Sequence, residues 1–219
     1  MTASPYGDFA QLGFDGAPAR LGILGGTFDP IHLGHLACAE AARCDLGLDG
    51  VLLMPAAVPV YKLDQQVTSA QQRLDMCRLA AQGNPFLQVS DLEIGRGGRT
   101  YTADTLRQVR EHFPSNVELV FIAGLDAAAT MPKWRESQVI ADLARIAVVT
   151  RPGSDLADLG DPHTLDGRFR VSVVRAPELA IASSDLRQRV AAGKSIRYLV
   201  PEPVREYVLA QGLYERNDR

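Results

Sequence analysis

The sequence predicts an α/β fold, a doubly wound parallel sheet in a single domain. Apolar runs of strand length alternate with longer amphipathic segments along the whole chain, without an internal repeat or a low-complexity run. That order is typical of parallel strands with helices on both faces and right-handed crossovers. The run at residues 117–123 is apolar almost throughout, as expected of a strand covered on both faces. A glycine turn follows the first run and indicates a ligand site at the carboxyl edge of the sheet.

Six strands are expected from the apolar runs, and Pro55 ends the second of them. The predicted strands cover residues 20–25, 51–54, 86–90, 117–123, 146–149 and 169–174. The segments after strands one, two, four and six carry the most unusual residues. Because parallel strands bring these segments to one edge of the sheet, we expect them to meet in space.

Helices are expected between the strands, at residues 36–46, from 68 to about 82, at 102–112, up to 144, at 184–192 and at 201–211. Their predicted N-caps are Thr68 (with Gln71 completing a capping box), Thr102 and Ser184, and their predicted stops are Gly47 and Gly193. Residues 95–99 are so rich in glycine that we expect a mobile loop. Residues 1–19 lack periodicity and are expected to form a flexible leader to a domain at 20–219.

The composition is that of an ordinary globular protein, with 46% hydrophobic and 22% charged residues. A formal net charge of -3 argues against a nucleic-acid partner, which usually requires clustered Lys and Arg. The longest apolar run is broken by prolines, and no signal peptide opens the sequence, so no membrane partner is expected. Three cysteines in helical patterns fit a reducing compartment, and we expect a cytoplasmic protein. The oligomeric state has no signature in the sequence.

Residues 25–35 predict a nucleotide-phosphate site. Backbone N–H groups of a glycine turn and a helix N-terminus bind phosphate, and two imidazoles can hydrogen-bond its oxygens. Gly34 would let a ligand approach between the two rings. Two alternatives are a buried pair of histidines and a zinc site of His32, His35 and Cys38, although no second Cys/His cluster completes a set of four ligands. The candidate residues of this turn are Gly25, Gly26, Thr27, Phe28, His32 and His35.

Residues 181–187 follow the last predicted strand and form a second candidate phosphate site. Ser183 and Ser184 can cap a helix and leave backbone N–H groups for phosphate, and the guanidinium of Arg187 suits phosphate oxygens. The alternative is ordinary capping beside a solvated arginine.

Two further positions suggest contacts with a nucleoside. Asp126 follows a buried strand and could accept hydrogen bonds from a ribose, with Gly124 permitting close approach; the alternative is a helix N-cap. Trp134, the only tryptophan, lies among polar residues, which favours an exposed ring that stacks on a heterocycle over partial packing in the core. Tyr101 and Thr102 could offer a hydroxyl and backbone N–H groups to a carboxylate.

These segments resemble known motifs. Residues 25–35 resemble the nucleotidylyltransferase superfamily pattern G-x-F-D-x-x-H-x-G-H, and residues 181–187 resemble its second motif, I-S-S-T-x-I-R, with Ala182 and Ser184 in place of a serine and the threonine. From residue 21 to 214 the chain resembles the bacterial nicotinate-mononucleotide adenylyltransferases, with matching segments at 98–106, 121–126, 132–134, 151–153 and 198–201. The resemblance implies a Rossmann-like nucleotidylyltransferase fold.

The resemblance also implies an activity and its partners: transfer of AMP from ATP to nicotinate mononucleotide, giving nicotinate adenine dinucleotide and pyrophosphate. Mg²⁺ would be held mainly by the ATP phosphates, with no protein metal site. The implied catalytic residues are His32, His35, Lys62 and Arg187. The implied ATP-binding residues are Gly25, Gly26, Thr27, Phe28, His35, Gly124, Ser183, Ser184 and Arg187, and the implied acceptor-binding residues are Lys62, Thr102, Asp126, Trp134 and Arg151. Tyr61 stands where the family often has a histidine before the lysine.

Three other functions fit the same residues. The acceptor could be nicotinamide mononucleotide, which differs by one carboxylate, or another phosphorylated molecule. The chain could also be a nucleotide-binding regulator without chemistry, although a regulator would not need all the charges of His32, His35, Lys62 and Arg187.

Overall fold

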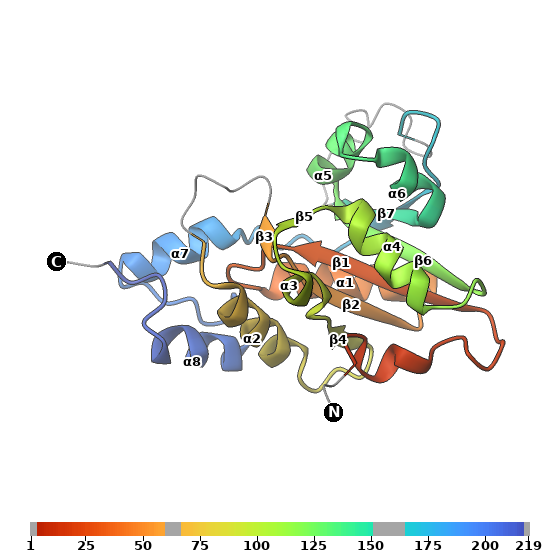
Figure 1. Cartoon of the computed structure of the whole chain (residues 1–219). Coiled ribbons are helices and arrows are strands. Elements are labelled where there is room, and N and C mark those ends of the chain that lie inside the picture. Colours follow the sequence, from red (N-terminus) through yellow and green to blue (C-terminus); the bar gives the residue numbers. More distant parts are fainter. Residues whose placement is uncertain (1–3, 60–66, 151–164, 217–219) are drawn as a thin grey trace.

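The centre of the molecule is a six-stranded parallel sheet (Figure 1). The computed structural model describes residues 4–59, 67–150 and 165–216. The strands of this sheet are β1 (Ala19–Gly26), β2 (Gly50–Pro55), β4 (Leu87–Val89), β6 (Val117–Gly124), β7 (Arg145–Thr150) and β8 (Val171–Arg175). Their spatial order is β4-β2-β1-β6-β7-β8, so the chain builds outward from β1 in one direction and then from β6 in the other. This confirms the predicted doubly wound α/β fold.

Helices cover both faces of the sheet (Figure 1). One face packs against α1 (Leu33–Leu46), α2 (Ala70–Ala81), α7 (Ser183–Ala191) and α8 (Glu202–Ala210). The other packs against the 3-10 helix η1 (Gly7–Gln11), α4 (Thr102–His112), α5 (Leu125–Thr130), the 3-10 helix η3 (Met131–Lys133) and α6 (Ser137–Leu143). In the described ranges, no helix has the length and apolar content needed to cross a membrane.

The alternation of side chains along each strand divides the interior into two apolar cores. On β2, Leu52 and Met54 face the core with α4 and α6, whereas Val51 and Leu53 face the core with α1 and α2. All four are fully buried, as expected of a parallel strand covered on both sides. The sheet is therefore covered by an apolar core on each face.

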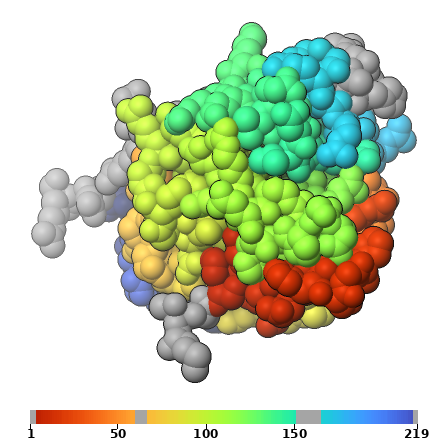
Figure 2. Space-filling view, turned by 45° about the vertical axis from the view of Figure 1, so that its right-hand side comes forward, coloured from red at the N-terminus to blue at the C-terminus, as the bar shows by residue number. Residues whose placement is uncertain are grey.

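The prediction of a flexible leader is wrong for residues 4–19. Tyr6 and Phe9 are 5% and 9% exposed and belong to the core with α4. The Tyr6 ring stacks on His112 at 4.2 Å between ring centroids, and its hydroxyl donates to the Gln108 carbonyl at 3.2 Å. Figure 2 shows the red N-terminal segment lying against the green segment that contains α4. The two buried aromatic rings, together with hydrogen bonds from Asn116 to the carbonyls of Gly13 and Ala17, dock this segment on the domain.

Several predicted helix starts are displaced by one to three residues. Helix α1 begins at Leu33 rather than at residue 36. The N-cap of α2 is Ser69, whose hydroxyl accepts from the backbone N–H of Gln72 at 3.3 Å, so the predicted Thr68–Gln71 box is off by one residue. The N-caps of α4 and α7 are Tyr101 and Ala182, not Thr102 and Ser184, and neither side chain caps its helix. Gly193 has a φ of 66°, the predicted left-handed conformation.

The segment predicted as a mobile glycine loop at 95–99 is structured. Helix α3 (Leu92–Arg96) ends there, Gly97 and Gly98 have φ values of 71° and 70°, and β5 (Arg99–Thr100) follows. Strand β5 pairs in parallel with β3 (Val58–Pro59) in a second, two-stranded sheet. The glycines thus turn the chain into a strand. The strand predicted at 169–174 begins at Val171, and Phe169 is buried before it.

Candidate active site

The centre of the sheet provides a crevice at its carboxyl edge. β1 and β6 are neighbours, and the chain leaves them in opposite directions across the sheet. Such a switch in strand order separates the loops that follow the two strands and opens a ligand site between them. Here those loops are residues 27–32, which lead into α1, and Gly124, which directly precedes α5.

The turn after β1 is shaped by one aromatic ring. Phe28 is only 2% exposed and has a φ of 52°, an uncommon conformation for a residue with a side chain. Its ring lies on Gly26, where an added Cβ would be 2.9 Å from ring atoms. Gly26 is therefore required for space. A Cβ added at Gly124, across the crevice, would meet no heavy atom of the described residues within 4 Å, so the backbone there is open to a ligand.

The two histidines pack on one another at the start of α1. The rings are stacked with centroids 3.7 Å apart, and the His32 backbone N–H donates to Nδ1 of His35 at 3.3 Å. His32 is 3% exposed, whereas His35 is half-buried and meets the Phe28 ring edge-on at 5.1 Å. His35 is thus the more exposed of the two rings, and His32 is buried beside it.

Gly34 has a different role from the predicted one. A Cβ at this position would lie 3.0 Å from Nδ1 of His32. The space that glycine leaves is filled by the imidazole of His32. The expectation that a ligand enters between the two rings at Gly34 is therefore wrong.

Asp29 connects the turn after β1 to two distant segments. Its carboxylate is 2% exposed, accepts from the hydroxyl of Tyr214 at 2.7 Å and accepts from the backbone N–H of Thr68 at 3.3 Å. Burial, followed by the negative charge of Asp29, raises the pKa of Tyr214, so the phenol stays protonated and donates. Asp29 therefore fixes the shape of the turn and is not directed at a ligand.

The second motif packs directly on the first. Nη1 of Arg187 donates to the carbonyl of Asp29 at 2.7 Å, and Oγ of Ser183 donates to the carbonyl of Pro30 at 2.9 Å. Ser184 is exposed beside them, and its Oγ donates to Asp185 at 3.3 Å. The structure thus brings together segments that are about 150 residues apart, as the strand order predicts.

A pocket of about 230 Å³ adjoins this turn and continues between α4 and η3. Trp134 is half-buried in its wall, donates from Nε1 to Oγ1 of Thr130 at 3.1 Å and meets Phe121 edge-on at 6.3 Å. The ring is therefore partly packed and lines the pocket, and its stacking on a heterocycle stays a prediction. The lining residues include Gly25, Gly26, Thr27, Tyr101, Thr102, Glu93, Lys133, Trp134 and Arg135.

Glu93 is a buried carboxyl group in this pocket. The side chain is 4% exposed and accepts from Oγ1 of Thr105 at 2.7 Å. Burial raises the pKa of Glu93 to about 7, although the hydroxyls of Thr105 and Thr100 and the charge of Arg96 oppose the shift. Burial therefore favours the neutral form of this carboxyl group in the pocket wall.

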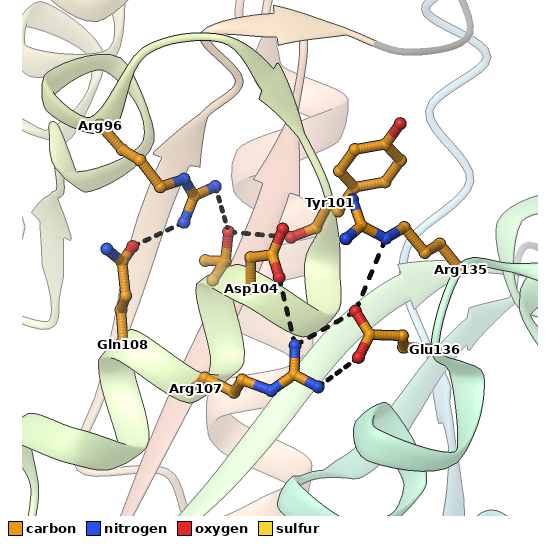
Figure 3. A network of polar contacts seen from close by, with 8 residues as sticks. Arg96, Tyr101, Asp104, Arg107, Gln108, Arg135 and Glu136 are labelled. Carbon is orange, nitrogen blue, oxygen red and sulfur yellow. Dashed lines mark hydrogen bonds and ion pairs between the residues drawn. The ribbon is translucent and has the colours of Figure 1, made fainter.

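A network of polar contacts lies beside the pocket and includes two of its lining residues, Tyr101 and Arg135 (Figure 3). Arg96 donates to Gln108 and to Thr105, at 2.6 and 3.1 Å. Farther along α4, Arg107 pairs with Asp104 at 3.2 Å and with Glu136 just before α6. The Arg135 guanidinium lies 4.4 Å from the centroid of the Tyr101 ring. These contacts hold α3, α4 and the Trp134 segment at fixed spacing around the pocket.

Of the remaining predicted site residues, the structure describes Asp126 but not Lys62 or Arg151. Asp126 is exposed in the first turn of α5. Lys62 and Arg151 lie outside the described residues. Within the described ranges, no group of three or more His, Cys, Asp or Glu side chains could hold a metal ion.

Comparison with known proteins gives consistent matches. A family model described as cytidylyltransferase-like matches residues 23–189. A relative from Roseiflexus sp. (strain RS-1) is 46% identical over 198 residues, which cover 90% of this chain and 98% of the relative. A relative from Moorella thermoacetica (strain ATCC 39073 / JCM 9320) is 42% identical over 200 residues, 90% and 92% of the two chains. Both relatives carry the name "Probable nicotinate-nucleotide adenylyltransferase".

Solved structures share the fold. The Plasmodium falciparum nicotinic acid mononucleotide adenylyltransferase complexed with NaAD superposes with a TM-score of 0.72 at 18% identity, covering 90% of this chain and 97% of that chain. The same Plasmodium falciparum protein complexed with APC superposes with a TM-score of 0.71.

Proposed function

Since the chain belongs to the cytidylyltransferase-like family, and within it to the nicotinate-nucleotide adenylyltransferases, we propose that the carboxyl edge of β1 and β6 is its active site. The enzyme transfers AMP from ATP to nicotinate mononucleotide and forms nicotinate adenine dinucleotide and pyrophosphate. We also propose that residues 20–219 form one catalytic domain, with the segment that holds Tyr6 and Phe9 packed into its core. A cytoplasmic location would give this domain its supply of ATP.

One observation carries the assignment of the site. The pocket that contains Trp134 and Thr102 also contains Gly25 and Thr27 of the turn after β1. An aromatic pocket for a flat ring and a backbone turn suited to phosphate therefore share one cavity. This is the arrangement that a reaction between two nucleotides requires, because both reacting phosphates must lie between the two binding sites.

In this proposal ATP binds along the turn after β1 and the start of α7. Gly25, Gly26, Thr27 and Phe28 present the backbone, Gly124 allows close approach across the crevice, and Ser183 and Ser184 begin α7 beside the phosphates. His35 donates to the α-phosphate, and His32 stacks behind it and fixes its orientation. The support for this division is the burial of His32 against the half-exposed His35.

Arg187 and Lys62 complete the cationic side of the site in this proposal. One N–H group of Arg187 donates to the carbonyl of Asp29, and this hydrogen bond orients the guanidinium along the turn. The other N–H groups of the guanidinium would then bind phosphate oxygens. Lys62 would contact both substrates. Its position in the chain is between two segments that line or adjoin the site, Pro59 and Thr68.

The acceptor would occupy the pocket between α4 and η3. Its pyridine ring stacks on Trp134, and the N-terminus of α4 at Thr102 receives the carboxylate. Asp126 accepts hydrogen bonds from the ribose, and Arg151 supplies a further cation. Lys133 and Arg135 also line the pocket, and these two cations favour the nicotinate carboxylate over the neutral amide of nicotinamide mononucleotide.

The chemistry then needs no covalent enzyme intermediate. An oxygen of the acceptor phosphate attacks the α-phosphorus of ATP, the bond from that phosphorus to the bridging oxygen breaks, and pyrophosphate leaves with the electron pair. The protein aligns two polyanions and offsets their repulsion through His35, Lys62 and Arg187. We propose that Mg²⁺ would enter with ATP, held mainly by the ATP phosphates, and that it would offset negative charge on the leaving pyrophosphate.

Pyrophosphate release tests this function. The protein with ATP and Mg²⁺ is given nicotinate mononucleotide, nicotinamide mononucleotide or phosphopantetheine in separate reactions, and the dinucleotide is identified by mass. We expect the highest kcat/KM with nicotinate mononucleotide. Equal rates with the amide would contradict the assigned role of the pocket cations, and binding of ATP without turnover of any acceptor would indicate a regulator.

A further inference from the structure

Arg73 on α2 is a buried cation outside the catalytic groups. Its side chain is 1% exposed, although arginine is among the residues that are least often buried. On the helix it occupies the same face as Cys77 and Ala80, which belong to the core. A charge in such a place is retained only where hydrogen bonds satisfy it.

The hydrogen bonds of Arg73 go to three backbone carbonyls. Nη1 donates to Thr27 at 2.8 Å, Nη2 donates to Ala57 at 3.0 Å and Nε donates to Thr68 at 3.0 Å. No salt bridge of Arg73 is present in the described part of the chain. The N–H groups of the guanidinium thus bind the backbone of three separate loops and hold these loops in place.

Each of these loops borders the active site. Thr27 belongs to the turn after β1, which lines the pocket and which we propose binds phosphate. Ala57 follows β2 and precedes β3, and Thr68 precedes the N-cap of α2 and also donates its N–H to Asp29. Arg73 therefore joins the turn after β1 to both ends of the segment that contains Lys62.

The connection continues to the acceptor pocket through Ala57. The N–H of Ala57 donates to Oγ1 of Thr100 at 3.1 Å, and β3 and β5 pair beside it. Thr100 lines the pocket and immediately precedes Tyr101 and Thr102. A path of short contacts thus runs from the ATP side of the cavity, through the Arg73 guanidinium, to its acceptor side.

We infer that Arg73 is a positioning residue that fixes the ATP turn and the acceptor pocket relative to each other through the carbonyls of Thr27, Ala57 and Thr68. This rests on the proposed function, because only there do both sides of the cavity hold reacting groups. Arginine is required, since its planar fork serves three acceptors in different directions, whereas a lysine ammonium is a point donor on a flexible stem.

The test compares Arg73→Met and Arg73→Lys with Met76→Ala. Met76 lies on the same helix, is fully buried and contacts no loop of the site through a hydrogen bond, so its truncation lowers stability alone. All variants are assayed at a temperature where circular dichroism shows them folded. Acceptor affinity is followed by the fluorescence of Trp134, the only tryptophan, and hydrogen exchange is measured by mass spectrometry.

Both Arg73 variants are expected to lose about 10- to 100-fold in kcat/KM for ATP, because small misplacements of aligned groups have effects of that size. They should also bind the acceptor more weakly and exchange the amide hydrogens of residues 27–29, 57 and 100–102 faster than the parent. Met76→Ala should keep kcat/KM within about twofold of the parent despite a lower Tm. The inference is overturned if Arg73→Lys matches the parent in activity and exchange, or if Met76→Ala loses as much activity.

The two proposals fail in different ways. A parent protein that releases no pyrophosphate contradicts the proposed function, and the exchange measurement still decides whether Arg73 fixes the three loops. A parent that is active while the Arg73 variants are equally active contradicts only the positioning role. If Arg73→Met does not fold, Arg73→Lys, which keeps the buried charge, decides the outcome.

Discussion

Replacing Glu93 by Gln should make the protein more stable at pH 8 and leave its stability unchanged at pH 4.5. Burial raises the pKa of the Glu93 carboxyl from its ordinary value of 4.5 to about 7. Between these pH values the unfolded chain loses this proton and the folded chain keeps it. The free energy of unfolding therefore falls as pH rises through this window, and it levels off above pH 7.

The size of the effect follows from the two pKa values. A difference of about 2.5 pH units, at about 1.36 kcal/mol each, corresponds to about 3 kcal/mol. Glutamine keeps an oxygen that accepts from Thr105 and carries no ionisation cost, so Glu93→Gln should gain about 3 kcal/mol over the parent at pH 8. For a domain of this length that gain raises Tm by roughly 6 to 12 °C.

Urea unfolding at intervals between pH 4.5 and 8.5 measures this difference. Glu206→Gln on α8 is the matched control, because Glu206 is exposed. The reasoning is refuted if the stabilities of Glu93→Gln and the parent change with pH in parallel, since the carboxyl would then ionise alike in both states.

Three further predictions address the site and the N-terminal segment. His35→Ala should lower kcat about 10²- to 10³-fold with an unchanged circular dichroism spectrum, if the ring acts like an oxyanion-hole donor; an active variant would remove His35 from the mechanism. Trp134→Ala should raise the KM for the acceptor about 5- to 150-fold, the equivalent of a stacking energy of about 1–3 kcal/mol, and leave the KM for ATP unchanged. Steady-state kinetics with each substrate varied measure both constants, and a raised KM for ATP alone would mean that the ring binds ATP instead. Phe9→Ala should lower the free energy of unfolding, measured in urea, by about 3 kcal/mol, because the ring is buried in the core against Gly50. A decrease below about 0.5 kcal/mol would mean that residues 4–19 add little to the stability of the fold.

The fold class could be predicted because its cause is local and repeated. Strands buried on both faces, such as β2 and β6, read as continuous apolar runs, and the helices between them show their own period. The helix stop at Gly193 was also predicted correctly, because a glycine in the left-handed conformation after a helix is a local signal. Cap positions are harder to assign, since Thr68 and Ser69 are both good caps and only the path of the preceding loop chooses between them.

What the sequence could not show depends on contacts between distant segments. Tyr6 and Phe9 resemble part of a flexible leader because their partners on α4 lie about 100 residues away. Arg73 resembles an ordinary surface charge, although its place on the apolar face of α2, four residues before Cys77, was a usable signal. Glu93 gave no signal at all, since its burial results from the packing of α3 beside β2 and from its contacts with Thr105 on α4 and Thr100 on β5.

The pairing of Asp29 with Tyr214 has a consequence for synthesis of the enzyme. The carboxylate and the phenol are 185 positions apart in the chain. At about 5–20 residues per second, a ribosome needs about 10 to 40 s to produce the phenol after the carboxylate has been made. During that time a nascent chain carries the turn after β1 without its Tyr214 contact, and it gains this contact only after α8 has been made.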